Sequence, residues 1–237
     1  MRGISVAAGG IASAGAGSGP AGAAVPRLRG LLHACAFPVA VAAGAVLVAL
    51  APTWPARLAA AVYGVAAAVL FGVSATYHRS PLGSRRRALL ARLDHMSILL
   101  LIAGTYTPLA ALALRDWTRL IVLAVIWAGA AGGILAQLIW RPGWRPAPRW
   151  LSTSLFIALG WVAVFVLPQV LRTAGALVLA LILAGGIMYS LGAVVYARKR
   201  PNPSPRWFGF HEVFHAATIL AYLTQYAGVS LIVYRMA

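Results

Sequence analysis

The chain has 237 residues, of which 62% are hydrophobic and only 10% are charged, and its mean hydropathy is +0.85. Water-soluble domains carry about 25% charged residues, so this composition excludes a soluble enzyme and indicates that lipid is the solvent. The chain contains 20 basic and 3 acidic residues, and its one cysteine, Cys35, excludes a disulfide framework or a cysteine-rich zinc site.

In chain order, residues 1–26 come first and are mostly Gly, Ala and Ser with two prolines. Such a segment can neither bury much surface nor hold a helix, and we predict that it is disordered. A signal peptide and an overextended translation start are the alternatives.

Seven later stretches reach the roughly 20 apolar residues that a membrane-crossing helix needs. They are Leu31–Ala51, Arg57–His78, Arg92–Leu114, Arg119–Trp140, Trp150–Gln169, Thr173–Ala197 and His211–Tyr234. The prediction is an all-α membrane protein, a seven-transmembrane-helix bundle over residues 27–237. In the fourth stretch Gly129 and Gly133 predict a close helix crossing.

The basic residues lie in short clusters between these stretches, which is typical of topology signals and not of a nucleic-acid-binding surface. Fifteen of the 20 fall in the N-terminal segment and in the second, fourth and sixth loops, and five fall on the other side. The N-terminus is therefore predicted to be cytoplasmic and the C-terminus outside. Membrane lipids are the expected partners, and nucleic acid is not.

Two pairs of polar residues at predicted span ends share a spacing of four residues, which places each pair on one helix face. Ser74 and His78 end the second span, and His211 and His215 begin the seventh. Two imidazoles so placed can bind one metal ion. The alternative is a pair of interfacial histidines bonded to lipid or backbone.

The string His211-Glu212-Val213-Phe214-His215 has the form H-E-x-x-H, which in zinc proteases requires a third ligand. No His, Asp, Glu or Cys follows His215, so a third ligand must come from an earlier span. The predicted topology brings His78, Asp94 and His211 to the cytoplasmic face. Three histidines and a water form the open tetrahedral site typical of catalytic zinc.

Other polar residues near the same face have structural interpretations. We interpret Glu212 as the partner of an interfacial arginine. His33 and His95 are interpreted as histidines whose hydrogen bonds are satisfied at the membrane interface. The third acidic residue, Asp116, lies in a short loop on the other side.

Three motifs together resemble the hemolysin III group of the progestin and adipoQ receptor family. They are Ser74-Ala75-Thr76-Tyr77-His78, Asp94-His95 with Gly104-Thr105-Tyr106-Thr107-Pro108, and His211-Glu212-Val213-Phe214-His215. The resemblance runs from about Arg27 to the end of the chain. It implies a seven-helix protein of a bacterial cell membrane with a cytoplasmic N-terminus.

The resemblance also implies Zn²⁺ held by His78, His211 and His215. Asp94 would then bond to the water of the zinc site, whose pKa the metal lowers to about 7, and act as the base. Ser74 would orient that water or donate to a developing oxyanion; a hydrogen bond back to the Leu70 carbonyl is its alternative role. Family members often carry another histidine late in the seventh helix, where this chain has Gln225.

The activity that this resemblance favours is zinc-dependent hydrolysis of a lipid amide, ceramide-like or another acyl amide or ester, in membrane lipid homeostasis. The first alternative is a non-catalytic, zinc-stabilised regulator that senses the bilayer and binds a partner through its basic loops. The second is a cytolytic pore-former, which is disfavoured because the predicted spans lack a repeated polar face.

Overall fold

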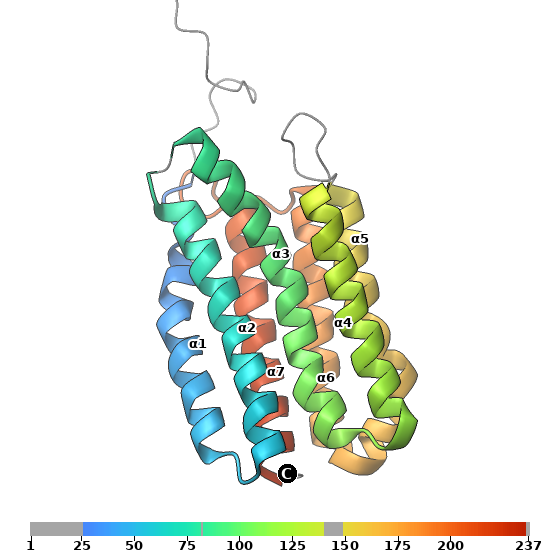
Figure 1. The fold of residues 1–237 in the computed structure, drawn as a ribbon. Helices are drawn as coiled ribbons and strands as arrows, with labels where there is room; N and C mark the ends of the chain where they lie inside the picture. Colours follow the sequence, from blue (N-terminus) through green and yellow to red (C-terminus); the bar gives the residue numbers. More distant parts are fainter. Residues whose placement is uncertain (1–25, 82, 140–148, 236–237) are drawn as a thin grey trace, which may run out of the picture.

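The computed structural model describes residues 26–81, 83–139 and 149–235, which form a bundle of helices (Figure 1). The elements are α1 (Leu31–Leu50), α2 (Trp54–Arg79), α3 (Ser84–Pro108), the π-helical turn η1 (Leu109–Ala113), α4 (Asp116–Ile139), α5 (Arg149–Gly160), the 3-10 helix η3 (Trp161–Val166), α6 (Leu167–Arg198) and α7 (Phe210–Arg235). These described ranges contain no strand, which confirms the all-α prediction for them. Of the segment 1–26, predicted to be disordered, all but Pro26 lies outside the described residues.

Six helical segments of the described chain are long and apolar enough to cross a membrane. They are Leu31–Leu50, Trp54–Arg79, Ser84–Ala113, Asp116–Ile139, Ser152–Arg198 and Phe210–Arg235. Five of them correspond one to one to predicted spans. The sixth, Ser152–Arg198, has 47 residues and contains most of the fifth predicted span and all of the sixth. At its centre Gly175 leaves the helical conformation, with φ 87° and ψ 169°, a backbone that glycine adopts without steric cost.

Large apolar side chains cover much of the outside of the bundle. Val65, Phe165 and Leu138 are exposed, Phe165 to 86%. In water such a surface would aggregate, whereas in a bilayer it contacts acyl chains. The protein is therefore a multi-pass membrane protein.

Two clusters of buried side chains hold the helices together. One joins α1, α2 and α7 through residues such as Phe71 and Tyr222. The other joins the helices from α3 to α6 through residues such as Ile126 and Val170. Helix α3 contributes to both clusters and so connects the two halves of the bundle.

Small residues allow close helix contacts at two places. A Cβ atom added to Gly44 of α1 would lie 3.0 Å from Gly64 of α2. A Cβ atom at Gly133 of α4 would lie 2.7 Å from Leu99 of α3 and 2.8 Å from Leu155 of α5. The predicted close crossing at Gly133 is thus an intramolecular one.

The junction between α5 and η3 is shaped by a side chain from α3. The Tyr106 hydroxyl donates a hydrogen bond to the Gly160 carbonyl and accepts one from the Ala163 amide, each of 2.7 Å. A hydroxyl inserted into the helical hydrogen-bond ladder interrupts it, and the chain continues as a 3-10 helix. This junction forms part of the wall of the cavity described below.

One end of the bundle carries the start of α1, the α2–α3 connection and the chain that leads into α7, while the last described residues of α7 lie at the other end (Figure 1). At the first end the segment before α1 is fixed to the segment before α7. The Arg27 and Leu28 amides donate to the carbonyls of Arg206 and Trp207 at 3.0 and 3.3 Å. The Arg27 guanidinium also lies over the Trp207 ring, 4.7 Å from its centroid. These contacts join the two segments at the end of the bundle where the histidines lie.

Candidate metal centre

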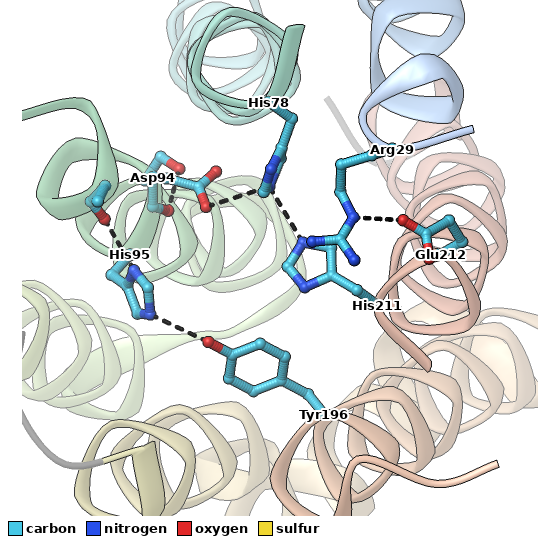
Figure 2. A network of polar contacts seen from close by, with 9 residues as sticks. Arg29, His78, Asp94, His95, Tyr196, His211 and Glu212 are labelled. Atoms are coloured by element: carbon cyan, nitrogen blue, oxygen red, sulfur yellow. Dashed lines mark hydrogen bonds and ion pairs between the residues drawn. The ribbon is translucent and has the colours of Figure 1, made fainter. Parts of the chain in front are cut away.

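Two helices bring the three predicted metal ligands together, and a third helix places Asp94 beside them. Figure 2 shows two of these ligands, His78 and His211, with Asp94. His78 lies in the last turn of α2, and His211 and His215 lie one turn apart near the start of α7. Asp94 projects from α3 on the far side of His78 from His211. Residues more than a hundred positions apart in the chain thus share one end of the bundle.

The spacing of the imidazole nitrogens suits a single ion. The Nε2 atoms of His78 and His211 lie 3.0 Å apart, and the candidate ligand atoms of His78, His211 and His215 all lie within 4.8 Å of one another. Nitrogens at 2.0–2.1 Å from one tetrahedral zinc ion lie about 3.3 Å apart. Small side-chain adjustments would therefore bring all three to bonding distance.

Asp94 and Ser74 lie next to this cluster without belonging to it. The Asp94 Oδ2 atom is 4.0 Å from His78 Nε2, and the buried Ser74 hydroxyl interacts with the Asp94 carboxyl. The alternative role of Ser74, a bond to the Leu70 carbonyl, does not occur among the hydrogen bonds of the described part of α2. Both predicted site residues thus stand where they can contact a group held by the histidines.

Glu212 is bound by Arg29 and by the backbone at the start of α7, and it does not belong to the three-histidine cluster. Its carboxylate accepts hydrogen bonds from Arg29 Nε at 2.5 Å and from the Gly209 amide at 2.8 Å. The second bond satisfies an amide at the N-terminus of the helix, as in a capping box. The interpretation of Glu212 as the partner of an arginine is confirmed, and Figure 2 shows the carboxylate of the H-E-x-x-H glutamate facing Arg29.

The two remaining histidines differ from each other. His95 is bonded as expected: its Nδ1 lies 2.8 Å from the Ala91 carbonyl and its Nε2 lies 3.4 Å from the Tyr196 hydroxyl. His33 departs from its interpretation as a satisfied interfacial histidine, because it is 3% exposed and neither ring nitrogen has a hydrogen-bond partner among the described residues. Its ring stacks on that of His215.

Two cavities meet at the cluster. The inner cavity, of about 120 Å³, runs among largely apolar side chains and is lined at one end by His33, Ser74 and His215. The vestibule, of about 210 Å³, is more polar and is lined by His78 and His211. Their shared wall consists of Asp94, Ile98, Phe156, Ala193 and Phe214. Among the described residues of this wall Asp94 is the one ionisable side chain, and its carboxylate borders both cavities.

Sequence reasoning missed several residues of these walls. Arg29, Arg87 and Tyr196 line the vestibule, and Tyr106 and Trp161 line the inner cavity. The sequence around each of these residues does not indicate that it lines a cavity, because helix packing brings the residues together. Gln225, the predicted departure from the family pattern, also lines the inner cavity and donates to the Ile182 carbonyl at 3.0 Å.

Comparison with known proteins identifies the family of this chain. Residues 23–226 match the family described as "Haemolysin-III related". Hemolysin-3 of Bacillus cereus is 35% identical over 159 residues, which cover 67% of this chain and 70% of that protein. The Hemolysin-3 homolog of Bacillus subtilis (strain 168) is 28% identical over 150 residues, covering 63% of this chain and 68% of that protein.

A more distant relative comes from an animal. Progestin and adipoQ receptor-like protein 1 of Caenorhabditis elegans is 26% identical over 152 residues, which cover 59% of this chain and 35% of that protein. The chain thus spans about a third of that relative. The resemblance to the hemolysin III group is confirmed, because the family match extends over most of the chain and includes all three clustered histidines. The chain belongs to the haemolysin-III related family of membrane proteins.

Proposed function

We propose that this protein is a zinc-dependent hydrolase that cleaves an acyl amide or ester bond of a membrane lipid and so acts in membrane lipid homeostasis. One observation carries the proposal: a three-histidine cluster and a carboxylate lie where an apolar cavity meets a polar vestibule. Such a junction suits a substrate with a long apolar part, a reactive carbonyl and a polar part.

His78, His211 and His215 would hold the metal, and their donor set fits zinc because imidazole is one of its usual ligands. A bound zinc ion supplies Lewis acidity and makes water a nucleophile near neutral pH. Within this arrangement His78 and His215 reach the cluster from different helices. The packing of α2 against α7 therefore determines how well the ligand set is formed.

Asp94 is the proposed general base and acid. Its Oδ2 accepts a proton from the attacking water, whose oxygen bonds to the acyl carbon, and then delivers a proton to the leaving nitrogen as the C–N bond breaks. The products are a fatty acid and an amine. The buried Ser74 hydroxyl, next to Asp94, orients the carboxylate or donates to the oxyanion that develops on the carbonyl.

The inner cavity is the proposed site of the acyl chain. Most of its wall residues come from α3, α5, α6 and α7 and include Leu101, Ile157 and Phe214. Burying methylene groups there stabilises the complex by about 0.8 kcal/mol each. Long acyl chains should therefore bind more tightly than short ones.

The seven-helix topology is part of the proposal. A straight helix of 47 residues would be about 70 Å long, more than twice the ~30 Å hydrocarbon core, so we propose that Ser152–Arg198 crosses twice and turns near Gly175. Residues 27–237 then form one domain with the histidine cluster on the cytoplasmic side. After Cys35→Ser, a cysteine placed at Asn202 should react with an impermeant maleimide in inside-out vesicles and not in intact cells.

The test of hydrolysis is release of fatty acid from lipid amides and esters by the purified protein. Zinc-loaded protein should release fatty acid, and chelator-treated protein should release it only after zinc is restored. A His211→Ala/His215→Ala variant should bind no zinc and remain inactive. Stoichiometric zinc without turnover on any acyl lipid would reject the hydrolase and favour the zinc-stabilised regulator.

A further inference from the structure

The vestibule differs in chemistry from the inner cavity that it joins. Polar and charged side chains of five helices and of the segment before α1 line it, among them Arg29, Arg87, His95, Tyr196 and Thr153. Figure 2 shows three of its lining residues, Arg29, His78 and His211, close together, with Arg29 paired to Glu212. A polar group, rather than an acyl chain, suits this space.

One cationic side chain of the vestibule has no ion-pair partner among the acidic residues of the described chain. The chain has three acidic residues: Glu212 is bound by Arg29, Asp94 faces His78, and Asp116 begins α4. Within the described ranges none of the three forms an ion pair with Arg87. The Arg87 guanidinium lies instead over the Tyr77 ring, 5.6 Å from its centroid, and no carboxylate of the described residues forms an ion pair with it.

We infer that the vestibule is a binding site for an anionic polar group of the acyl lipid, a carboxylate or a phosphate, held by Arg87, with Arg29 in the lining of the same cavity. Guanidinium groups bind both anions through paired hydrogen bonds. Because Asp94 lies on the wall between the two cavities, a lipid with its chain in the inner cavity would present its carbonyl at Asp94 and its polar group at Arg87. This inference rests on the proposed hydrolase and narrows its substrates to anionic N-acyl lipids.

The experiment compares three ligands with the same acyl chain: N-acylglycine, N-acylethanolamine phosphate and neutral N-acylethanolamine. Dissociation constants are measured with full-length, zinc-loaded protein carrying Asp94→Asn, a background in which the proposed turnover is blocked. The two anionic ligands should bind at least ten times more tightly than the neutral one. The stronger of the two identifies whether the vestibule prefers carboxylate or phosphate.

A matched pair of variants separates the site from general surface charge. Arg86 and Arg87 are adjacent and exposed, and only Arg87 lines the vestibule. Arg87→Gln should weaken binding of the anionic ligands about ten-fold, as expected for a charge-assisted hydrogen bond, and leave the neutral ligand unchanged. Arg86→Gln should change none of the three by more than two-fold.

Each result has a distinct meaning. Equal losses in the two arginine variants, or equal binding of neutral and anionic ligands, would overturn the anion site. Hydrolysis of neutral amides by the wild-type protein in that case would leave the hydrolase intact. Selective anion binding without any hydrolysis by the wild type would reject the hydrolase and keep the site.

Discussion

The imidazole of His33 lies flat against that of His215, with ring centroids 3.7 Å apart and an angle of 5° between the planes. The same His33 ring packs edge-on against Phe71, at 5.1 Å and 81°. Helix α1 thus fixes the orientation of a proposed metal ligand on α7. His33 and His215 both line the inner cavity, so the stacked pair forms part of its wall.

Removing this stack should weaken zinc binding. Stacked rings contribute roughly 0.5–1.5 kcal/mol beyond their buried area, so His33→Leu should raise the zinc dissociation constant about three- to ten-fold in a competition titration with a chromophoric chelator. His33→Phe keeps a flat ring and should stay within two-fold of the wild type. If both variants lost affinity equally, the ring nitrogens and not the stack would be responsible.

Asp94→Asn should separate metal binding from turnover. The carboxylate lies 4.0 Å from His78 Nε2 and outside the three-histidine group, so the variant should keep one zinc per chain. Because the change removes the proposed general base, the rate of fatty acid release should fall by about 10²–10⁴-fold. Unchanged turnover would remove Asp94 from the mechanism, and an intact lipid-related phenotype in cells that carry the variant would favour the regulator.

Glu212→Ala should destabilise the protein without touching a proposed ligand. The change leaves the Gly209 amide without its acceptor and Arg29 without its carboxylate, at a cost of roughly 1–3 kcal/mol. The melting temperature in detergent should fall by several degrees. Glu212→Gln keeps an acceptor for the Gly209 amide and should lower the melting temperature less. An equal fall in the two variants would show that the ion pair alone contributes to stability.

The adjacent glycines Gly132 and Gly133 provide a test of the packing of α4. A methyl group at Gly133 would meet Leu99 and Leu155 at under 3 Å, whereas nothing lies within 4 Å of one at Gly132. Gly133→Ala should therefore lower the free energy of unfolding by roughly 1–3 kcal/mol, and Gly132→Ala should not. A matching loss at Gly132 would contradict the described contact between α3, α4 and α5.

Much of the fold follows from the sequence because lipid imposes a simple rule on apolar length. Apolar length locates the membrane spans, but it does not predict where each helix ends outside the membrane. Helix α3 begins at Ser84 and not at Arg92, since arginines continue the helix beyond its apolar part. Likewise Gly175, where the helix breaks, is not distinguishable by composition from other glycines of the same span.

The candidate site, too, can be predicted from the sequence only in part. The four-residue spacing of His211 and His215 and the expected side of His78 are local properties, and they predict that the three residues meet. The stack of His33 on His215 and the position of Arg87 in the vestibule depend on the rotation and packing of helices. A single sequence does not determine this rotation and packing. For that reason the sequence does not indicate that the ring nitrogens of His33 lack hydrogen-bond partners among the described residues.

The central claim is that His78 of α2 and the His211/His215 pair of α7 hold one divalent cation. The most direct measurement is the metal content of detergent-purified protein, by mass spectrometry, for the wild type, His78→Ala and His95→Ala. His95 lines the same vestibule but lies outside the three-histidine group. We predict one zinc per chain in the wild type and in His95→Ala, and almost none in His78→Ala; full zinc occupancy in His78→Ala would contradict the claim.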